Sequence, residues 1–411
     1  MILGLSAFAA SVALAAPTVK NVVMTQGADR LVTVTYDLED EDAIVTLSVE
    51  TNGVPLAEGE VANLSGDVNK VVAAGNDKSI IWRACQSWPN HKVENARARV
   101  TAWSKKSPPQ YLVIDLLKGS AAKAGNLMPS YYYTSAATVP GGVTNIRYKT
   151  THMLFRRVEP TDDLGFVMGS PANETGRNNN ETRHTVNFVN HAPFYLGVYE
   201  FTQGQRYYLL DEAVTATEAT AAVNFNIAKL MTRLASGGTW PCLETGTGVY
   251  HETIKSRTGL RFYAPTEAQW EYACRAGTTG AFNDGTADAE SDDKDSHLDK
   301  LGLYAGNPVS PTGPGEVGQF EPNAWGFYDM HGNVREWTAS TYYSGSSNPQ
   351  TDPVCMDGSA NSNYDVRGGY WGSPATSCRS AFRNQTIYCN AQTVISDNAT
   401  GVRFALSCSE L

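Results

Sequence analysis

The sequence predicts an α+β protein in which a small all-β sandwich precedes a larger, loop-rich domain. Three observations carry this prediction. Residues 17–105 alternate apolar and polar side chains in short runs, as antiparallel strands do. From residue 151 onward, two helix capping boxes stand among short strand-like runs and long polar segments. The length of 411 residues exceeds that of one ordinary domain.

Composition and charge narrow the class of protein. Apolar residues make up 42% of the chain and charged residues only 18%, so a large core is expected and global disorder is not. The formal net charge of −10 argues against nucleic acid or an anionic membrane surface as a partner. The 7 cysteines are odd in number, which leaves at least one thiol outside any intramolecular disulfide.

The N-terminal residues 1–16 (MILGLSAFAASVALAA) are apolar and small, and they predict a signal peptide. Ala13 and Ala15 fit a small-x-small cleavage site, with the cut after Ala15 or nearby. The segment is too short to span a membrane, and no other run reaches that length. The mature protein is therefore expected to be exported, with a periplasmic, cell-surface or secreted location and no membrane span.

Residues 17–105 are expected to form a β-sandwich of the immunoglobulin or fibronectin type. Residues 31–38 (LVTVTYDL) and 43–50 (AIVTLSVE) alternate clearly, and residues 79–82 and 96–103 add further strand-like runs. About seven short strands in so short a stretch are typical of such sandwiches.

Residues 106–150 are expected to be a linker that docks partly on one domain. The segment opens at a Pro-containing break, contains one apolar strand-like run at 111–117 (YLVIDLL), and ends near a Pro-Gly-Gly turn at 140–142.

Residues 151–411 are expected to form the α+β domain. Thr202 caps one helix, with Gln205 at the third helical position, and Thr266 with Gln269 repeats this capping box. Short strands are predicted at 165–170, 194–200 and 401–406. One more helix is predicted within 219–237, and residues 284–300 are expected to form a solvated acidic loop.

Residues 323–337 (NAWGFYDMHGNVREW), here called the central turn, form the most distinctive stretch of this domain. Gly332 and Asn333 suit backbone at positive φ. Asp329, Asn333 and Glu336 bring oxygen-bearing side chains close together in the sequence, which suits a hard cation such as Ca²⁺. The residues alone also suit a purely structural turn whose polar groups bond to each other. In such a turn His331 is expected to bond a carbonyl rather than a metal.

Several motifs of residues 155–408 occur in a fixed order and together resemble the formylglycine-generating enzyme family, also called sulfatase-modifying factors. These motifs are FVMGSPANETGR (166–177), FYLGVYEFTQGQ (194–205), APTEAQWEYACRAG (264–277), the central turn, RGGYW (367–371), CRSAFR (378–383) and GVRFA (401–405). The resemblance implies an elaborated C-type-lectin-like fold for residues 151–411.

The resemblance also implies a structural Ca²⁺ ion at the central turn. Its ligands would be the side chains of Asp329 and Glu336 and the backbone carbonyls of Gly332 and Val334.

The oxidases that this chain resembles bind copper and a substrate thiol through two cysteines, at the fourth and ninth residues after the RGG motif. Here these positions hold Ser373 and Cys378. One thiolate cannot provide the pair that Cu(I) prefers, so copper is not expected. Formylglycine formation on a sulfatase cysteine, with Cys378 as the catalytic residue, stays an alternative.

The favoured hypothesis is a non-catalytic protein that binds an unknown protein or glycan ligand; a purely structural surface protein is the third possibility. The region 370–400 is similar to the variable C-terminal segment of diversity-generating-retroelement target proteins. Aromatic and small polar residues make adaptable binding surfaces. The candidate ligand-binding residues are Tyr370, Trp371, Ser373, Thr376, Phe382, Asn384, Tyr388 and Asn390.

Other prominent residues of this domain are expected to be structural. Arginine suits bidentate clamping of carboxylates and loops. The arginines expected to act in this way are Arg367, Arg379, Arg383 and Arg403. The tryptophans expected to lie in the core rather than on a ligand surface are Trp270, Trp337 and Trp371, although Trp371 is also among the candidate ligand-binding residues.

Overall fold

The computed structural model describes residues 16–28, 30–57, 60–61, 63–91, 95–118, 127–160, 165–188, 193–223, 249–307, 312–341, 348, 350–351, 364–383 and 398–411. All but the last residue of the predicted signal peptide, and most of the helix predicted within 219–237, lie outside these residues. Within them, no helix is both long and apolar enough to cross a membrane. The chain divides into unit 1 (Met1–Pro109 with Tyr132–Thr138) and unit 2 (Gln110–Tyr131 with Val139–Leu411).

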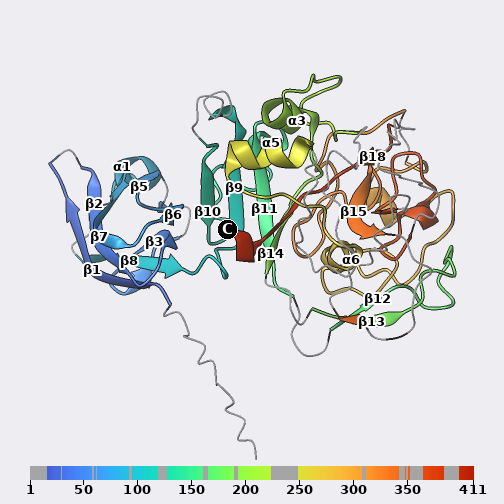
Figure 1. Ribbon diagram of the computed structural model, residues 1–411, viewed down its shortest axis with the longest axis horizontal. Helices are drawn as coiled ribbons and strands as arrows, with labels where there is room; N and C mark the ends of the chain where they lie inside the picture. The colour runs from blue at the N-terminus through green and yellow to red at the C-terminus, as the bar shows by residue number, and fades with distance from the viewer. Residues whose placement is uncertain are drawn as a thin grey trace, which may run out of the picture. The chain divides into compact units, whose positions relative to one another are not determined.

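The described residues of unit 1 form two sheets and one short helix (Figure 1). The first sheet has the order β1 (Thr18–Gln26), β2 (Val32–Glu39), β7 (Gly75–Trp82) and β5 (Leu64–Gly66). The second has the order β4 (Val54–Pro55), β3 (Ala43–Thr51) and β6 (Val71–Val72), with β8 (Ala96–Trp103) paired to β3. The helix is α1 (Ala84–Ser87).

The two sheets of unit 1 share one apolar core. Val34 of β2 and Ile80 of β7 belong to the same buried cluster as Val45 and Leu47 of β3. Burying such aliphatic side chains stabilises the fold by roughly 1.5–3 kcal/mol each. The predicted alternation therefore places the apolar face of each sheet against the other. The assignment to the immunoglobulin or fibronectin type stays a prediction.

The largest sheet of unit 2 joins segments that are far apart in the sequence. Its order is β10 (Ser130–Tyr133), β9 (Tyr111–Asp115), β11 (His152–Val158), β14 (Phe194–Gly197) and β19 (Ala405–Ser407). The boundary between the units falls within β10, after Tyr131. On β11, Phe155 lies opposite Leu112 of β9 on one side and Gly197 of β14 on the other. Strand β9 comes from the segment predicted as a linker, so that segment contributes to the sheet.

Two smaller sheets complete the strands described in unit 2. They are β12 (Phe166–Met168), β13 (His184–Asn187) and β16 (Gln350–Thr351), and β17 (Tyr364–Arg367), β15 (Arg335–Thr341) and β18 (Thr400–Gly401). The strand predicted at 401–406 is divided between β18 and β19, because the chain passes there from one sheet to another. Arg403 lies in this crossing and is fully buried.

The helices of unit 2 confirm both capping boxes. The Thr202 hydroxyl accepts from the N–H of Gln205, whose side chain accepts from the N–H of Thr202, at the start of α3 (Gln203–Leu210). Thr266 and Gln269 repeat these bonds at α6 (Glu267–Arg275).

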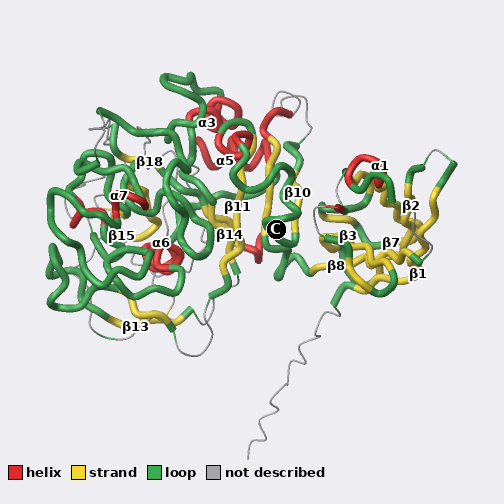
Figure 2. Tube along the Cα trace, turned by 180° about the vertical axis from the view of Figure 1, so that it is seen from behind, coloured by secondary structure: helices red, strands yellow, loops and turns green. Residues whose placement is uncertain are grey.

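Two further helices, α5 (Val249–Thr258) and α7 (Leu298–Leu301), were not predicted. The sequence of α5 (VYHETIKSRT) lacks the apolar stripe that would predict a helix. Helix α5 lies beside α3 (Figure 2). With five sheets and few helices in the described ranges, the chain is a mixed α and β protein.

Candidate functional site

The central turn has the backbone conformation that its sequence predicts. Asp329, Gly332 and Asn333 have φ values of 56°, 85° and 53°. A Cβ atom on Gly332 would lie 2.1 Å from the carbonyl oxygen of Leu303, so this position accepts only glycine without a shift of backbone.

The side chain and the backbone of Asn333 both form hydrogen bonds that connect the central turn to other segments. Its side-chain nitrogen donates to Glu200, and its side-chain oxygen accepts from the N–H of Gly315 at 2.8 Å. Its backbone N–H donates to the carbonyl of Leu303 at 2.8 Å, and its own carbonyl accepts from the N–H of Trp371 at 2.9 Å. The turn is therefore bonded directly to the chain that follows the RGG motif.

Three buried carboxylates lie at this turn: Asp329 and Glu336 belong to it, and Glu200 accepts a hydrogen bond from Asn333. The Glu336 carboxylate pairs with the Arg403 guanidinium (Nη2–Oε1 2.7 Å) and accepts from the indole N–H of Trp270 at 2.7 Å. Asp329 accepts from the N–H of Gly318 at 2.6 Å.

The electrostatics of these groups reflect a surplus of buried negative charge. Burial, followed by repulsion from Asp329 and Glu336, raises the pKa of Glu200 well above its ordinary value. Burial likewise raises the pKa of Asp329 to about 6, although Arg403 and Lys149 oppose the shift. Three carboxylates thus share two buried cationic side chains, and a bound cation would relieve their repulsion.

The four predicted Ca²⁺ ligands fit such a cation unequally. The Asp329 carboxylate fits best, because only its Oδ2 atom accepts a hydrogen bond from the described chain. Both carboxylate oxygens of Glu336 already accept from Arg403 or Trp270. No group of three or more His, Cys, Asp or Glu side chains in the described residues is arranged to hold a metal ion. The predicted Ca²⁺ site has only two carboxylates, and its other two ligands are backbone carbonyls. The absence of a group of three such side chains therefore does not test the Ca²⁺ prediction.

The predicted ligand-binding residues that the structure describes divide into a half-buried set and a buried set. Tyr370 and Trp371, here called the aromatic face, are half-buried, and so is Phe382. Asn384, Tyr388 and Asn390 lie outside the described residues.

Ser373 and Thr376 are buried and do not suit the predicted role. The Ser373 hydroxyl accepts from the N–H of Tyr370 at 3.1 Å, and the Thr376 hydroxyl donates to Asp292. These bonds shape the turn at 370–373 and fix the 3₁₀-helix η4 (Ala375–Cys378). Sequence reasoning missed this because the partners of Thr376 and Ser373 include residues far away in the sequence, Asp292 for Thr376 and Ala305 for Ser373.

Arg335 belongs beside the aromatic face and was not among the predicted residues. Its guanidinium carbon lies 5.0 Å from the ring centre of Tyr370, and its Nε donates to the Thr400 hydroxyl at 2.8 Å. Its neighbour Glu336 is buried, and alternation along β15 turns Arg335 to the opposite side. That alternation was the signal available in the sequence.

Cys378 lies in the protein core. Its sulfur would be only 2.6 Å from a Cβ atom built on Gly369, and burial raises its pKa to about 12. Cys274 is equally buried, with a pKa raised to about 12 by burial and its sulfur 3.6 Å from the Ser380 hydroxyl. Both thiols therefore stay protonated near neutral pH, which does not suit the alternative role of Cys378 as a catalytic thiolate.

His331 bonds a carbonyl, as expected from its place in the central turn. Its Nδ1 lies 2.7 Å from the carbonyl oxygen of Cys378, and its Nε2 accepts from the N–H of Asn283 at 3.2 Å. These partners fix a neutral ring with the proton on Nδ1. Burial lowers its pKa to about 4.

The four arginines expected to be structural are buried and paired with carboxylates, which confirms their role. The pairs are Arg367 with Glu267 and Glu271, Arg379 with Glu174 and Glu181, Arg383 with Glu267 and Asp365, and Arg403 with Glu336. Trp270 and Trp337 are also fully buried. These residues form a rigid frame behind the aromatic face.

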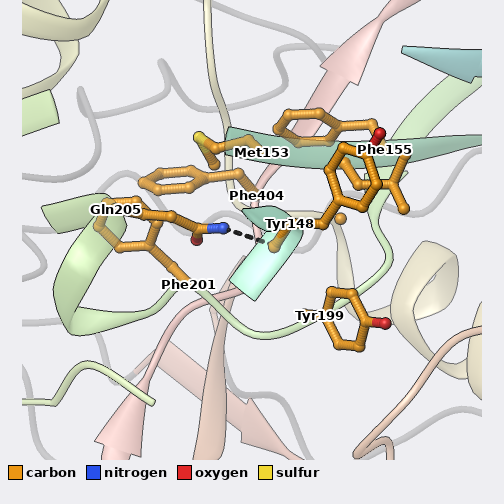
Figure 3. A pocket seen from close by; sticks show the side chains of 9 residues that line it. Tyr148, Met153, Phe155, Tyr199, Phe201, Gln205 and Phe404 are labelled. Carbon is orange, nitrogen blue, oxygen red and sulfur yellow. Dashed lines mark hydrogen bonds between the residues drawn. The ribbon is translucent and has the colours of Figure 1, made fainter. Parts of the chain in front are cut away.

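A small cavity lies elsewhere in unit 2, beneath the start of α3 (Figure 3). It is lined mainly by apolar side chains, among them Met153, Phe155 and Phe404. The side-chain nitrogen of Gln205 donates to the carbonyls of Tyr148 (3.0 Å) and His152 (2.9 Å). Its volume of about 10 Å³ suits one water molecule at most, so it is a packing defect rather than a ligand site.

The model of the sulfatase-modifying factor enzyme 1-like domain matches residues 156–407. The chain belongs to this family.

Two curated relatives of the family domain are formylglycine-generating enzymes. That of Mycobacterium tuberculosis (strain ATCC 25618 / H37Rv) is 35% identical over 86 residues, which are 19% of this chain and 27% of the relative. That of Mus musculus is 39% identical over 83 residues, 18% of this chain and 21% of the relative. The aligned part thus spans about a quarter of each relative.

Three solved structures resemble the chain at low TM-scores. Treponema denticola variable protein 1 is 18% identical with a TM-score of 0.46, covering 62% of this chain and 96% of its own. PvdO from Pseudomonas aeruginosa is 26% identical with a TM-score of 0.43, covering 62% and 94%. CarF is 20% identical with a TM-score of 0.31, covering 61% and 97%. Neither a ligand nor an activity follows for this chain from resemblances of this kind.

Proposed function

We propose that this protein is an exported, non-catalytic ligand-binding protein whose sulfatase-modifying-factor domain has a C-type-lectin-like fold. One observation carries the proposal. The two positions that would hold the thiolates of a copper oxidase contain Ser373, which is buried, and Cys378, which is buried and has a pKa raised to about 12. A single buried, protonated thiol is a poor ligand for Cu(I), and a serine hydroxyl cannot replace the second thiolate.

The arrangement around the aromatic face supports binding. Tyr370 and Trp371 stay partly exposed, while the frame behind them is held by buried arginine–carboxylate pairs and by the Asn333–Trp371 bond. Partly exposed residues on a rigid scaffold are where proteins usually place binding function. The proposed ligand is a protein or a glycan. An adenine-mutated template repeat beside the gene would support diversification of the segment that follows.

The proposal includes a structural Ca²⁺ ion at the central turn, held by Asp329 and Glu336 and by the carbonyls of Gly332 and Val334. It is supported by the surplus of buried carboxylates, which raises the pKa values of Glu200 and Asp329. Such an ion would stabilise the turn and take no part in chemistry.

Binding is tested with glycan and peptide arrays probed by the full-length mature protein and by Trp371→Ala and Tyr370→Ala. The expected result is a ligand bound by the wild type and lost in both variants, with melting temperatures within a few degrees of the wild type. A ligand that both variants retain, or unfolding of both variants, would contradict the assigned site. Tyr207→Ala, which changes an exposed tyrosine on α3, serves as the control.

The oxidase remains the competing function because the curated relatives are formylglycine-generating enzymes. It is tested by O₂ consumption with a cysteine-containing sulfatase peptide and supplied Cu(I). No turnover is expected. Turnover that Cys378→Ala abolishes would overturn the non-catalytic proposal.

A further inference from the structure

We infer that the free edge of strand β8 in unit 1 is a second binding site, which takes an extended acidic segment of a partner protein as an added strand. The inference goes beyond the proposed function, because it concerns unit 1 and does not involve the aromatic face.

Strand β8 is paired along one side only. It pairs antiparallel with β3 over its whole length, from Ala96 opposite Thr51 to Trp103 opposite Ile44. Within the described ranges, no strand pairs with its other side. Strand β1 comes close to β8, but its backbone pairs with β2. Every second N–H and C=O group of β8 therefore points away from β3, toward an open edge.

The strand order explains why this edge is open. The first sheet of unit 1 has the order β1, β2, β7 and β5, which corresponds to the complete first sheet of an immunoglobulin-type sandwich. In that type, the strand that corresponds to β8 pairs with the next strand of the chain. Here the next strand is β9, and it pairs with β11 in the largest sheet of unit 2. The strand that would cover β8 is therefore used elsewhere.

Arg97 and Arg99 give this edge a positive charge. Both side chains are exposed, whereas Ala96 and Ala98 pack against the core. Neither guanidinium takes part in an ion pair within the described structure, although Glu50 of β3 lies opposite Arg97. Opposite charges on neighbouring strands stabilise their pairing. An added strand with carboxylates at alternating positions would place them beside both guanidinium groups.

The chemistry of the edge selects the kind of partner. Alternating N–H and C=O groups match another peptide backbone, which a glycan does not provide. A second copy of β8 does not fit, because antiparallel pairing of two such strands would bring the arginines of both copies together. The occupant is therefore an acidic segment of another protein.

The test measures the binding of synthetic peptides to the full-length mature protein by fluorescence anisotropy. The peptides match β8 in length: one alternates Glu and Thr, one alternates Lys and Thr, and one is the Glu–Thr peptide with its backbone amides N-methylated. Only the unmodified Glu–Thr peptide is expected to bind, and its binding should weaken as salt is added. It should also slow hydrogen exchange of the amides of residues 96–103, which a contact through side chains alone would not do.

Each of Arg97→Ala and Arg99→Ala should weaken binding of the Glu–Thr peptide about two- to fivefold. Lys78→Ala is the matched control, because it removes the same charge from β7, a strand of the other sheet. This variant should bind the peptide like the wild type.

Three outcomes would overturn the inference. The first is no binding of the Glu–Thr peptide by the wild type, in which case the arginines only protect the edge from self-association. The others are equally tight binding of the N-methylated peptide and unchanged binding by both arginine variants. None of these outcomes concerns the aromatic face, so the proposed function is tested separately.

Discussion

The backbone N–H of Trp371 donates to the carbonyl oxygen of Asn333 at 2.9 Å, which joins the aromatic face to the central turn. The Asn333 side chain in turn bridges Glu200 and the backbone of Gly315. The position of the aromatic face therefore depends on one asparagine in the left-handed region.

Replacing Asn333 by alanine should destabilise unit 2 by about 2–5 kcal/mol. The substitution leaves a buried N–H of Gly315 unbonded and removes one hydrogen bond from Glu200, which costs roughly 1–3 kcal/mol. Alanine at a φ of 53° adds roughly 1–2 kcal/mol. Urea unfolding followed by tryptophan fluorescence measures the change.

Asn333→Gly separates the two contributions, because glycine adopts this φ freely and lacks the side-chain bonds. It should be less destabilising than Asn333→Ala. Equal stability of both variants and the wild type would contradict the role given to this residue.

Breaking the buried pair of Arg403 and Glu336 should cost about 3–5 kcal/mol, because it leaves a charge without its partner. Arg403 also donates to the carbonyls of Gly197, Val198 and Tyr328. Arg403→Lys should therefore lose most of the stabilisation that Arg403 gives to unit 2, although lysine keeps the positive charge. Thermal unfolding of Arg403→Met and Arg403→Lys measures this, and a lysine variant as stable as the wild type would show that charge alone matters.

The features of this fold that could be predicted are those set by residues close together in the sequence. The capping boxes at Thr202 and Thr266 depend on residues three apart, and the positive φ at Gly332 and Asn333 depends on the turn itself. Each could be found because the chemistry lies within a few residues.

Features that depend on long-range packing could not be predicted. Ser373 and Cys378 look available in the sequence, yet both are buried. The contact of Arg335 with Tyr370 joins positions 35 residues apart. Alternation along β15 indicates the side of the strand on which Arg335 lies, but it does not identify the residue that Arg335 contacts. The run 401–406 was predicted as one strand, but the chain leaves one sheet before Arg403 and joins another after it. The sequence does not show that these two sheets are neighbours.

Calcium should raise the stability of unit 2 if the central turn binds it. An ion at 100 times its Kd adds about 2.7 kcal/mol, so the melting temperature should rise with Ca²⁺ and fall with a chelator. Asp329→Asn should abolish this response, because it removes the best-placed carboxylate. Calorimetry with Ca²⁺ and Mg²⁺ measures it, with the exposed Glu321→Gln as control. A response that survives in Asp329→Asn would place the ion elsewhere.

Unit 2 should lose stability in acid through Glu271. Burial alone would favour the neutral carboxyl, but Arg275 and Arg367 outweigh it and hold the pKa of Glu271 below its ordinary value of 4.5. The unfolded chain therefore binds this proton more readily than the folded one. The stabilisation from Glu271 is full above pH 4.5 and is lost as the pH falls through the lower pKa of the folded state.

Melting temperatures of the wild type and Glu271→Gln between about pH 3 and 7 test this linkage. The variant should be less stable near neutral pH, where it removes the carboxylate that pairs with Arg275 and leaves Arg367 with Glu267 alone. Its curve should also be flatter below pH 4.5, although Glu267, whose pKa is likewise lowered, keeps part of the slope. Parallel curves for the two proteins would show that another carboxylate governs acid unfolding.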